Sequence, residues 1–111
     1  MVDFRVDDGF GSHPKTVGMS DAAVVVWLLG GCWSVRYLTD GRVPGQVLAN
    51  IAGRRRRAIP ELVERGLIEP VDGGDWQYVD WMQYQRSRNQ IQSEREATRK
   101  RLAKWREDRK P

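Results

Sequence analysis

The chain has 111 residues, of which 40% are hydrophobic, and its 19 Lys and Arg against 15 Asp and Glu give a net charge of +4. This length suits one folded domain with at most a short extension. The single cysteine excludes an intramolecular disulfide, and the longest apolar run, residues 22–33, is too short to span a bilayer. Because the N-terminus MVDFRVDD is acidic and unlike a signal peptide, we expect a soluble cytoplasmic protein that does not bind membranes.

Charge is unevenly distributed along the chain. Residues 42–57 contain Arg42 and four consecutive arginines, Arg54 to Arg57, without an acidic residue, and residues 86–111 contain ten basic residues against four acidic ones. The segments before and between these two basic blocks carry more acidic than basic residues. This asymmetry favours a polyanionic partner that is bound in one orientation.

The first forty residues predict a short strand followed by one long helix. Phe4–Val6 has a strand-like composition, and the Asp7-Asp8-Gly9 sequence is typical of a turn. A helix is expected from about Ala22 to Leu38, with Ser20 or Asp21 as its N-cap. We predict that this helix is the central member of the fold.

The expected helix is apolar around most of its circumference, which is typical of a core element. The Gly30-Gly31 pair weakens it, so either a neighbouring segment approaches closely there or the helix bends. Trp27 and Leu28 are expected to be mostly buried. The other side chains expected to pack in the core are Cys32, Trp33 and Tyr37.

Residues 43–68 predict two short amphipathic helices joined by a tight turn. Apolar residues recur at helical spacing in Gln46–Ala52 and in roughly Arg56–Arg65. Gly53 between them can adopt the positive φ that ends one helix and leads into the next. Because Pro60 lies inside the second segment, that helix is expected to begin late, near Ala58, or to kink at the following residue.

A β-hairpin and a basic helix are expected to follow. Gly66 suits a helix cap, and residues 67–80 predict two strands around the turn sequence DGGD. The acidic tip of this hairpin is a poor contact for phosphate, so a hairpin that only closes the core is an open alternative to a wing that enters a groove. From Met82 onward the chain is polar, and a helix is expected from Ile91. It has no continuous heptad seam and is expected to lie partly free in solution.

These segments resemble a known family. Ala49, Gly53, Ile59 and Leu62 are similar to the pattern of a helix-turn-helix, and LVERGLIEP with VDGGDWQYVD resembles the last helix and wing of a winged-helix domain. Together with DFRVDDGFGSHPK, the tryptophan-rich segment before LTDGRVP, DWMQYQRSR and RLAKWREDRK, they resemble small winged-helix proteins of actinobacterial phages and prophages, some of them replication initiators. The resemblance implies an α+β fold, with a winged helix-turn-helix domain in residues 1–85 and a basic C-terminal helical extension in residues 86–111.

We expect the protein to bind double-stranded DNA in the bacterial host cytoplasm, in phage or prophage replication or transcription control. The helix-turn-helix of about residues 44–66 would place its arginine-rich recognition-helix start in the groove, and the C-terminal helix would add backbone contacts. No nucleophile pairs with the lone His13, and neither a phosphate-binding loop nor a metal-spaced cluster is present, so we expect no enzyme, cofactor or metal. The residues expected to contact DNA are Arg42, Gln46, Arg54, Arg55, Arg56, Arg57, Arg86, Arg88, Arg95, Arg99, Lys100 and Lys104.

Two other functions remain open. A phage-encoded interaction module that acts on a host protein would use the tryptophans and the C-terminal helix. An arginine-rich RNA binder would fold its basic end on its target. A host or phage protein on the C-terminal helix and a homodimer are further open alternatives.

Overall fold

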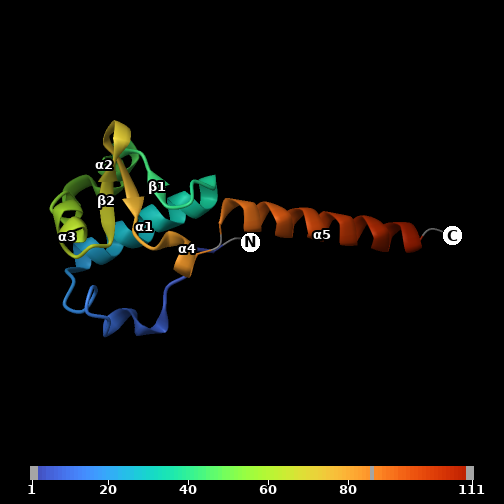
Figure 1. Ribbon diagram of the computed structural model, residues 1–111, viewed down its shortest axis with the longest axis horizontal. Helices are drawn as coiled ribbons and strands as arrows, with labels where there is room; N and C mark the ends of the chain where they lie inside the picture. The colour runs from blue at the N-terminus through green and yellow to red at the C-terminus, as the bar shows by residue number, and fades with distance from the viewer. Residues whose placement is uncertain (1–2, 86, 110–111) are drawn as a thin grey trace.

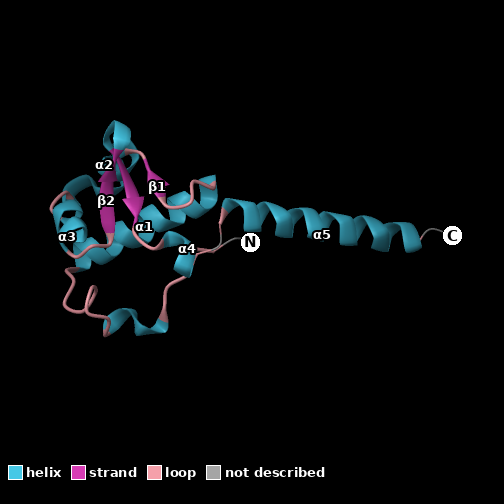
Figure 2. Cartoon of the chain, viewed as in Figure 1, coloured by secondary structure: helices cyan, strands magenta, loops and turns pink. Residues whose placement is uncertain are grey.

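The computed structural model describes residues 3–85 and 87–109 and shows an α+β chain, as expected (Figure 1). Figure 2 shows a small sheet beside the helices of the globular part, from which one long helix projects. The helices are α1 Asp21–Tyr37, α2 Gly45–Ala52, α3 Ala58–Glu64, α4 Trp81–Tyr84 and α5 Arg88–Asp108. The strands are β1 Arg42–Val43, β2 Ile68–Val71 and β3 Asp75–Tyr78, and short 3-10 turns occupy Asp8–Gly11, Gly53–Arg55 and Asp72–Gly74.

The three strands form one antiparallel sheet in the order β1-β3-β2. In the β2–β3 hairpin Ile68 lies opposite Tyr78, and β1 pairs Arg42 with Gln77 of β3. The connecting turn contains two glycines with φ of 76° and 77°, a conformation that L side chains rarely adopt. The predicted hairpin is confirmed, and it acquires a third, two-residue strand from the segment before α2.

Helix α1 packs against α2, α3 and β1 and is therefore the central helix of the globular part. The Ser20 side chain accepts a hydrogen bond from the Ala23 N–H at 3.1 Å, so Ser20 rather than Asp21 is the N-cap. At the other end Leu38 adopts the left-handed conformation and terminates the helix. The predicted helix is thus confirmed, with each boundary one residue earlier than expected.

The Gly30-Gly31 pair admits two aromatic side chains from distant segments. A Cβ atom on Gly30 would overlap the Tyr78 hydroxyl, and one on Gly31 would overlap the Phe4 ring. The Tyr78 hydroxyl donates a hydrogen bond of 2.6 Å to the Trp27 carbonyl of α1. Close approach of neighbours, the first of the two expected explanations, therefore accounts for these glycines.

The N-terminal segment contributes to the core without forming a strand, so the predicted strand at Phe4–Val6 is wrong. The Phe4 ring packs edge-on against Trp27 with centroids 4.9 Å apart and stacks on Trp81 at 5.8 Å. The Arg5 backbone is paired instead by the Gln85 amide, which accepts from its N–H at 2.8 Å and donates to its carbonyl at 2.6 Å. The Gln85 side chain thus satisfies the Arg5 N–H and carbonyl groups, which a neighbouring strand would otherwise pair.

Several expected core residues of α1 lie at its surface. Leu28 is 40% exposed and Tyr37 58% exposed, and Cys32 is exposed, so the predictions that these residues are buried are wrong. Trp27 and Trp33 are partly buried and pack at the edge of the core. The physical reason is that only one face of α1 meets the other elements, so apolar residues on the opposite face remain in contact with solvent.

The segment between α2 and α3 follows the expected pattern. Gly53 ends α2 with a φ of 53°, and α3 begins at Ala58, so the late start rather than a kink is confirmed. Pro60 then lies in the first turn of α3, where an N–H has no partner within the helix. The four arginines consequently precede α3 and form the turn that leads into it.

Helix α5 extends away from the globular part and gives the molecule principal dimensions of 62 × 32 × 22 Å (Figure 1). It begins at Arg88 with a capping box between Ser87 and Gln90, and the Arg88 N–H donates to the Asp40 carboxylate at 2.5 Å. Ile91 is buried at 2% exposure, and every described residue after it is exposed. Within residues 3–85 and 87–109, no helix combines the length and apolarity needed to cross a membrane.

Candidate nucleic-acid interface

Four consecutive arginines, Arg54 to Arg57, form the turn between α2 and α3. Arg54 and Arg55 belong to the 3-10 turn that starts at Gly53, and Arg57 is the N-cap residue of α3. All four are exposed. We call this segment the arginine turn.

The side chains of the arginine turn have no hydrogen-bonding or acidic partner in the part of the chain that the structure describes. Two other arginines of the globular part differ. Arg42 is paired with Asp75, and Arg65 lies 3.6 Å from the Glu61 carboxylate and donates to two backbone carbonyls. Four like charges without internal neutralisation favour an anionic partner.

The exposed face of α3 carries few groups that can read a base pair. Its exposed residues are Pro60, Val63 and Glu64, and Glu61 is engaged with Ser20. None of the three exposed side chains has a hydrogen-bond donor for a guanine edge or a phosphate. Contacts from this region to a nucleic acid would therefore come from the arginine turn rather than from the body of α3.

The β2–β3 hairpin folds toward the start of α2 and engages Arg42. The Arg42 guanidinium lies 3.0 Å from the Asp75 carboxylate and donates to the Asp72 carbonyl at 2.9 Å. The Gly45 N–H at the start of α2 also donates to Asp75, at 3.4 Å. Arg42 is half-exposed, but its ion pair with Asp75 holds the hairpin in place. The Asp75 carboxylate neutralises the Arg42 charge and so weakens any attraction between Arg42 and a phosphate. Gln46, on α2, is exposed and donates to the Asn50 side chain one turn later.

The basic residues of α5 divide between two faces. At 100° per residue, Arg88, Arg95 and Arg99 fall within about 40° of one another. Arg106 falls in the same row; sequence reasoning did not select it, although helical spacing alone places it there. Lys100 and Lys104 lie on a different face, and Lys100 is 3.4 Å from Glu96. We call the four residues Arg88, Arg95, Arg99 and Arg106 the arginine row.

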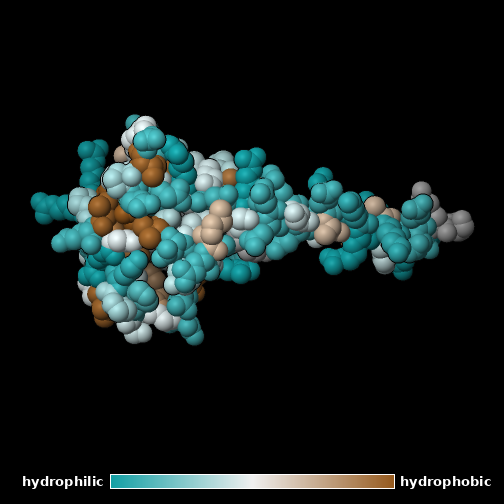
Figure 3. All heavy atoms as spheres, in the orientation of Figure 1, coloured by the Kyte–Doolittle hydropathy of each residue, from teal (hydrophilic) through white to brown (hydrophobic). Residues whose placement is uncertain are grey.

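The structure separates the two basic surfaces. The arginine turn lies at the end of the globular part away from α5, so the two surfaces are near opposite ends of the long axis (Figure 1). The long axis measures 62 Å, which corresponds to about 18 base pairs of duplex. The surface of α5 is mostly hydrophilic, whereas apolar patches appear on the globular part (Figure 3). Arg86, another residue expected to contact DNA, lies outside the described residues.

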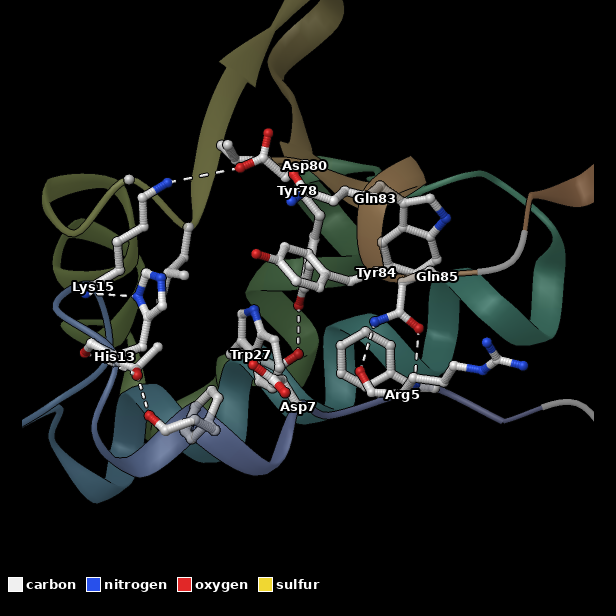
Figure 4. Close-up of a pocket in the computed structure, with 17 residues that line it drawn as sticks. Arg5, Asp7, His13, Lys15, Trp27, Tyr78, Asp80, Gln83, Tyr84 and Gln85 are labelled. Atoms are coloured by element: carbon white, nitrogen blue, oxygen red, sulfur yellow. Dashed lines mark hydrogen bonds and ion pairs between the residues drawn. The ribbon is translucent and has the colours of Figure 1, made fainter.

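A cavity of about 330 Å³ lies between the N-terminal segment, α1 and the end of β3 (Figure 4). Aromatic side chains, including Trp27 and Tyr78, form much of its lining. Most of its polar groups already have internal partners: Gln85 binds the Arg5 backbone, and Lys15 lies 3.9 Å from Asp80. We therefore interpret the cavity as part of the packing between the N-terminal segment and the rest of the globular part, rather than as a ligand site. Among the described residues no cluster of three or more His, Cys, Asp or Glu could hold a metal ion.

In comparisons with known proteins, no family model, no curated protein and no solved structure matches this chain.

Proposed function

We propose that this chain is a winged-helix protein that binds double-stranded DNA, with the arginine turn as its principal contact. The order α1-β1-α2-α3-β2-β3 and the sheet order β1-β3-β2 support a winged helix, in which α2 and α3 form the helix-turn-helix and the β2–β3 hairpin forms the wing. The resemblance described above adds a role in phage or prophage replication or transcription control in a bacterial cytoplasm, without catalysis.

The arginine turn is the observation that carries this proposal. A run of four exposed, unpaired guanidiniums at the entrance of the recognition helix is suited to phosphates and to the O6 and N7 atoms of guanine. Because the residues lie in a turn, they do not share one helical face. Some of them contact phosphates on each side of the groove while others face the base edges.

The hairpin has a supporting rather than a direct role in this proposal. Its tip contains Asp72 and Asp75, and Asp75 neutralises Arg42. An acidic tip repels phosphate, so the wing orients β1 and α2 and does not insert into a groove. Arg42 and Gln46 accordingly contribute less than the arginine turn.

The arginine row of α5 supplies a second, sequence-independent contact. It presents four guanidiniums along about 27 Å of helix, and the side chains beyond Ile91 are exposed. Backbone contacts of this kind raise affinity for every duplex alike. Lys100 and Lys104 lie on another face and would contribute only through long-range attraction.

The test measures binding to a duplex of about 24 base pairs as a function of salt. Each arginine of the turn that contacts a phosphate should, when changed to Gln, lower the slope of log affinity against log salt by about 0.9. One that reads a guanine should instead cost about 1–3 kcal/mol and relax preference at one base position.

The matched control is Arg65→Gln, which removes a guanidinium that is already paired inside the fold. It is expected to leave the salt slope unchanged. A folded variant with Arg54 to Arg57 all changed to Gln that binds duplex with unaltered affinity and slope would disprove the proposal. Tighter binding to RNA than to duplex DNA would favour the arginine-rich RNA binder, and absence of nucleic-acid binding would favour the protein-interaction module.

A further inference from the structure

The outer face of α1 carries a row of apolar side chains that nothing in the described chain covers. Leu28 is 40% exposed and Leu29 46% exposed, Cys32 is exposed, and Val25 is partly exposed. These residues recur at spacings of three and four and so lie on one stripe of the helix. The buried residues of α1 lie on the opposite face, where the helix meets α2 and α3. Single exposed apolar residues are common, but a continuous stripe marks an interaction surface.

The stripe is complementary to itself in the antiparallel direction. A two-fold axis between Leu28 and Leu29 places Leu28 of one chain against Leu29 of a second copy. The same axis places Val25, three residues before Leu28, against Cys32 of the second copy, three residues after its Leu29. The spacing of the stripe averages 3.5 residues, which suits two helices that cross at a shallow angle of about 20°.

Charge at the two ends of the stripe agrees with the same register. Asp21 in the first turn of α1 and Arg36 in the last turn are both exposed on this face. The axis between Leu28 and Leu29 brings Asp21 of each copy opposite Arg36 of the other. A parallel pairing would instead set Asp21 against Asp21 and Arg36 against Arg36. Each charge also suits the dipole of its own helix, so the charges select the direction of pairing while the apolar stripe drives it.

We propose that the protein forms a two-fold symmetric homodimer through the outer face of α1, with the helices antiparallel about the Leu28–Leu29 centre. An isologous interface requires one patch that is complementary to itself, and this stripe has that property in residue spacing, polarity and charge. The interface uses neither the arginine turn nor α5, so the inference stands independently of DNA binding.

The test exchanges charges between two variants of the full chain. In the Asp21→Arg variant both ends of the stripe are positive, and in the Arg36→Asp variant both ends are negative. A dimer of either variant alone would therefore place like charges opposite each other at both ends of the interface. Each variant should dimerise roughly tenfold more weakly than the native chain in sedimentation equilibrium. An equimolar mixture should restore a dimer, because both ends of the heterodimer are then oppositely charged.

The outcomes are distinct. Restoration in the mixture supports the proposed register, and circular dichroism checks that each variant retains its helix content. A native chain that stays monomeric at the highest soluble concentration overturns the proposal. A dimer that neither charge change nor Leu29→Glu weakens also overturns it, because association would then use another surface such as α5.

A disulfide experiment tests the register without relying on charge. Val25→Cys places a cysteine opposite Cys32 of the second copy, and mild oxidation should give a covalent dimer. The native chain should not cross-link, because its two Cys32 residues would lie about 10 Å apart along the helix axis, beyond the span of a disulfide. The control Val25→Cys with Cys32→Ser should likewise remain monomeric on a denaturing gel. Cross-linking of the native chain and the control as readily as Val25→Cys would exclude this register.

Discussion

At the scale of single residues, the fold depends on contacts between a few small and aromatic side chains. Gly30 and Gly31 leave room for Tyr78 of β3 and Phe4 of the N-terminal segment, which are far apart in the sequence and meet on α1. A residue that is unfavourable within a helix is therefore required here by packing. The aromatic rings and the glycines form one unit, so replacing one of them affects the others.

Gly30→Ala should destabilise the protein although alanine is the better helix former by about 1 kcal/mol. The new methyl group would displace the Tyr78 hydroxyl from the Trp27 carbonyl and press on Leu48, at a net cost of about 1–3 kcal/mol. Urea unfolding followed by circular dichroism measures this difference. Gly11→Ala is the control, because no atom lies within 4 Å of its Cβ, and it should change stability by less than about 0.5 kcal/mol. An unchanged or higher unfolding free energy for Gly30→Ala would contradict the packing described here.

Tyr78 should make the protein sensitive to alkaline pH. Burial raises the pKa of its hydroxyl far above the ordinary value of 10.0. The unfolded chain therefore loses this proton above pH 10.0 while the folded chain retains it, so stability is complete below that pH and falls as the pH rises, by up to about 1.4 kcal/mol per unit.

Tyr78→Phe should cost about 0.5–1.5 kcal/mol at neutral pH through the lost hydrogen bond. The substitution should also flatten the fall of the unfolding free energy above pH 10.0. The plots of unfolding free energy against pH for the native protein and the variant should therefore converge. Tyr84→Phe, at an exposed position, is the control and should retain the native slope. Parallel curves for the native protein and Tyr78→Phe would show that the hydroxyl does not stay protonated in the fold.

At the scale of elements, α1 and α3 are joined by a polar contact as well as by apolar packing. The Ser20 hydroxyl donates to the Glu61 carboxylate at 2.6 Å and the Ser20 N–H donates at 2.9 Å, while the same hydroxyl caps α1. Ser20 thus caps the start of α1 and also positions α3, the helix that follows the arginine turn. The orientation of α3 depends on this contact.

Glu61→Gln should lower stability at neutral pH by about 1 kcal/mol and reduce the loss of stability in acid. The hydrogen bonds from the Ser20 hydroxyl and N–H hold the pKa of Glu61 below its ordinary value of 4.5, with a smaller contribution from Arg65. A lowered pKa gives stability that is present above 4.5 and is lost as the pH falls further. The variant should therefore have a shallower profile below that pH.

Thermal unfolding between pH 7 and pH 2 measures this effect. Glu64→Gln is the control, because Glu64 lies on the exposed surface of α3, one turn after Glu61. This variant should keep the native pH profile. Identical profiles for Glu61→Gln and the native chain would show that the Ser20 contact does not influence stability.

At the scale of the whole molecule, the elongated shape results from one helix. The radius of gyration is 17.4 Å, against roughly 13 Å for a compact chain of this length. Helix α5 is fastened at its base by Ser87, Arg88 and Ile91, and its remaining residues contact solvent. The globular part and the outer three-quarters of α5 should therefore be energetically separate.

A chain that ends after Ser93 should keep the capping box and the buried Ile91, and its unfolding free energy should change by less than about 0.5 kcal/mol. It loses Arg95, Arg99 and Arg106, so its salt slope on a long duplex should fall by about 2.7. Truncation should reduce affinity more for a duplex of about 24 base pairs than for one of about 10 base pairs, since only the longer duplex spans both basic surfaces. A truncated chain that does not fold cooperatively would show instead that α5 is part of the core.

The local sequence determined most of the elements. The cap at Ser20, the turn at Gly53, the late start of α3 at Ala58 and the glycine hairpin all depend on residues within a few positions of one another. Local preferences do not depend on the rest of the chain, so these features could be predicted, although Asp21 as the cap and a kink in α3 were open alternatives. The arginine turn could be located for the same reason.

Only the tertiary structure decided which side chains are buried and which charges are neutralised. The apolar sequence of α1 does not distinguish its inner face from its outer one, so Leu28 and Tyr37 were expected in the core but are exposed. Likewise, Arg42 and the arginine turn are alike in sequence, yet the returning hairpin pairs Arg42 with Asp75 and leaves the turn unpaired. The reason is physical: burial and ion pairing depend on segments that meet across long sequence separations, and local sequence does not encode which of them will meet.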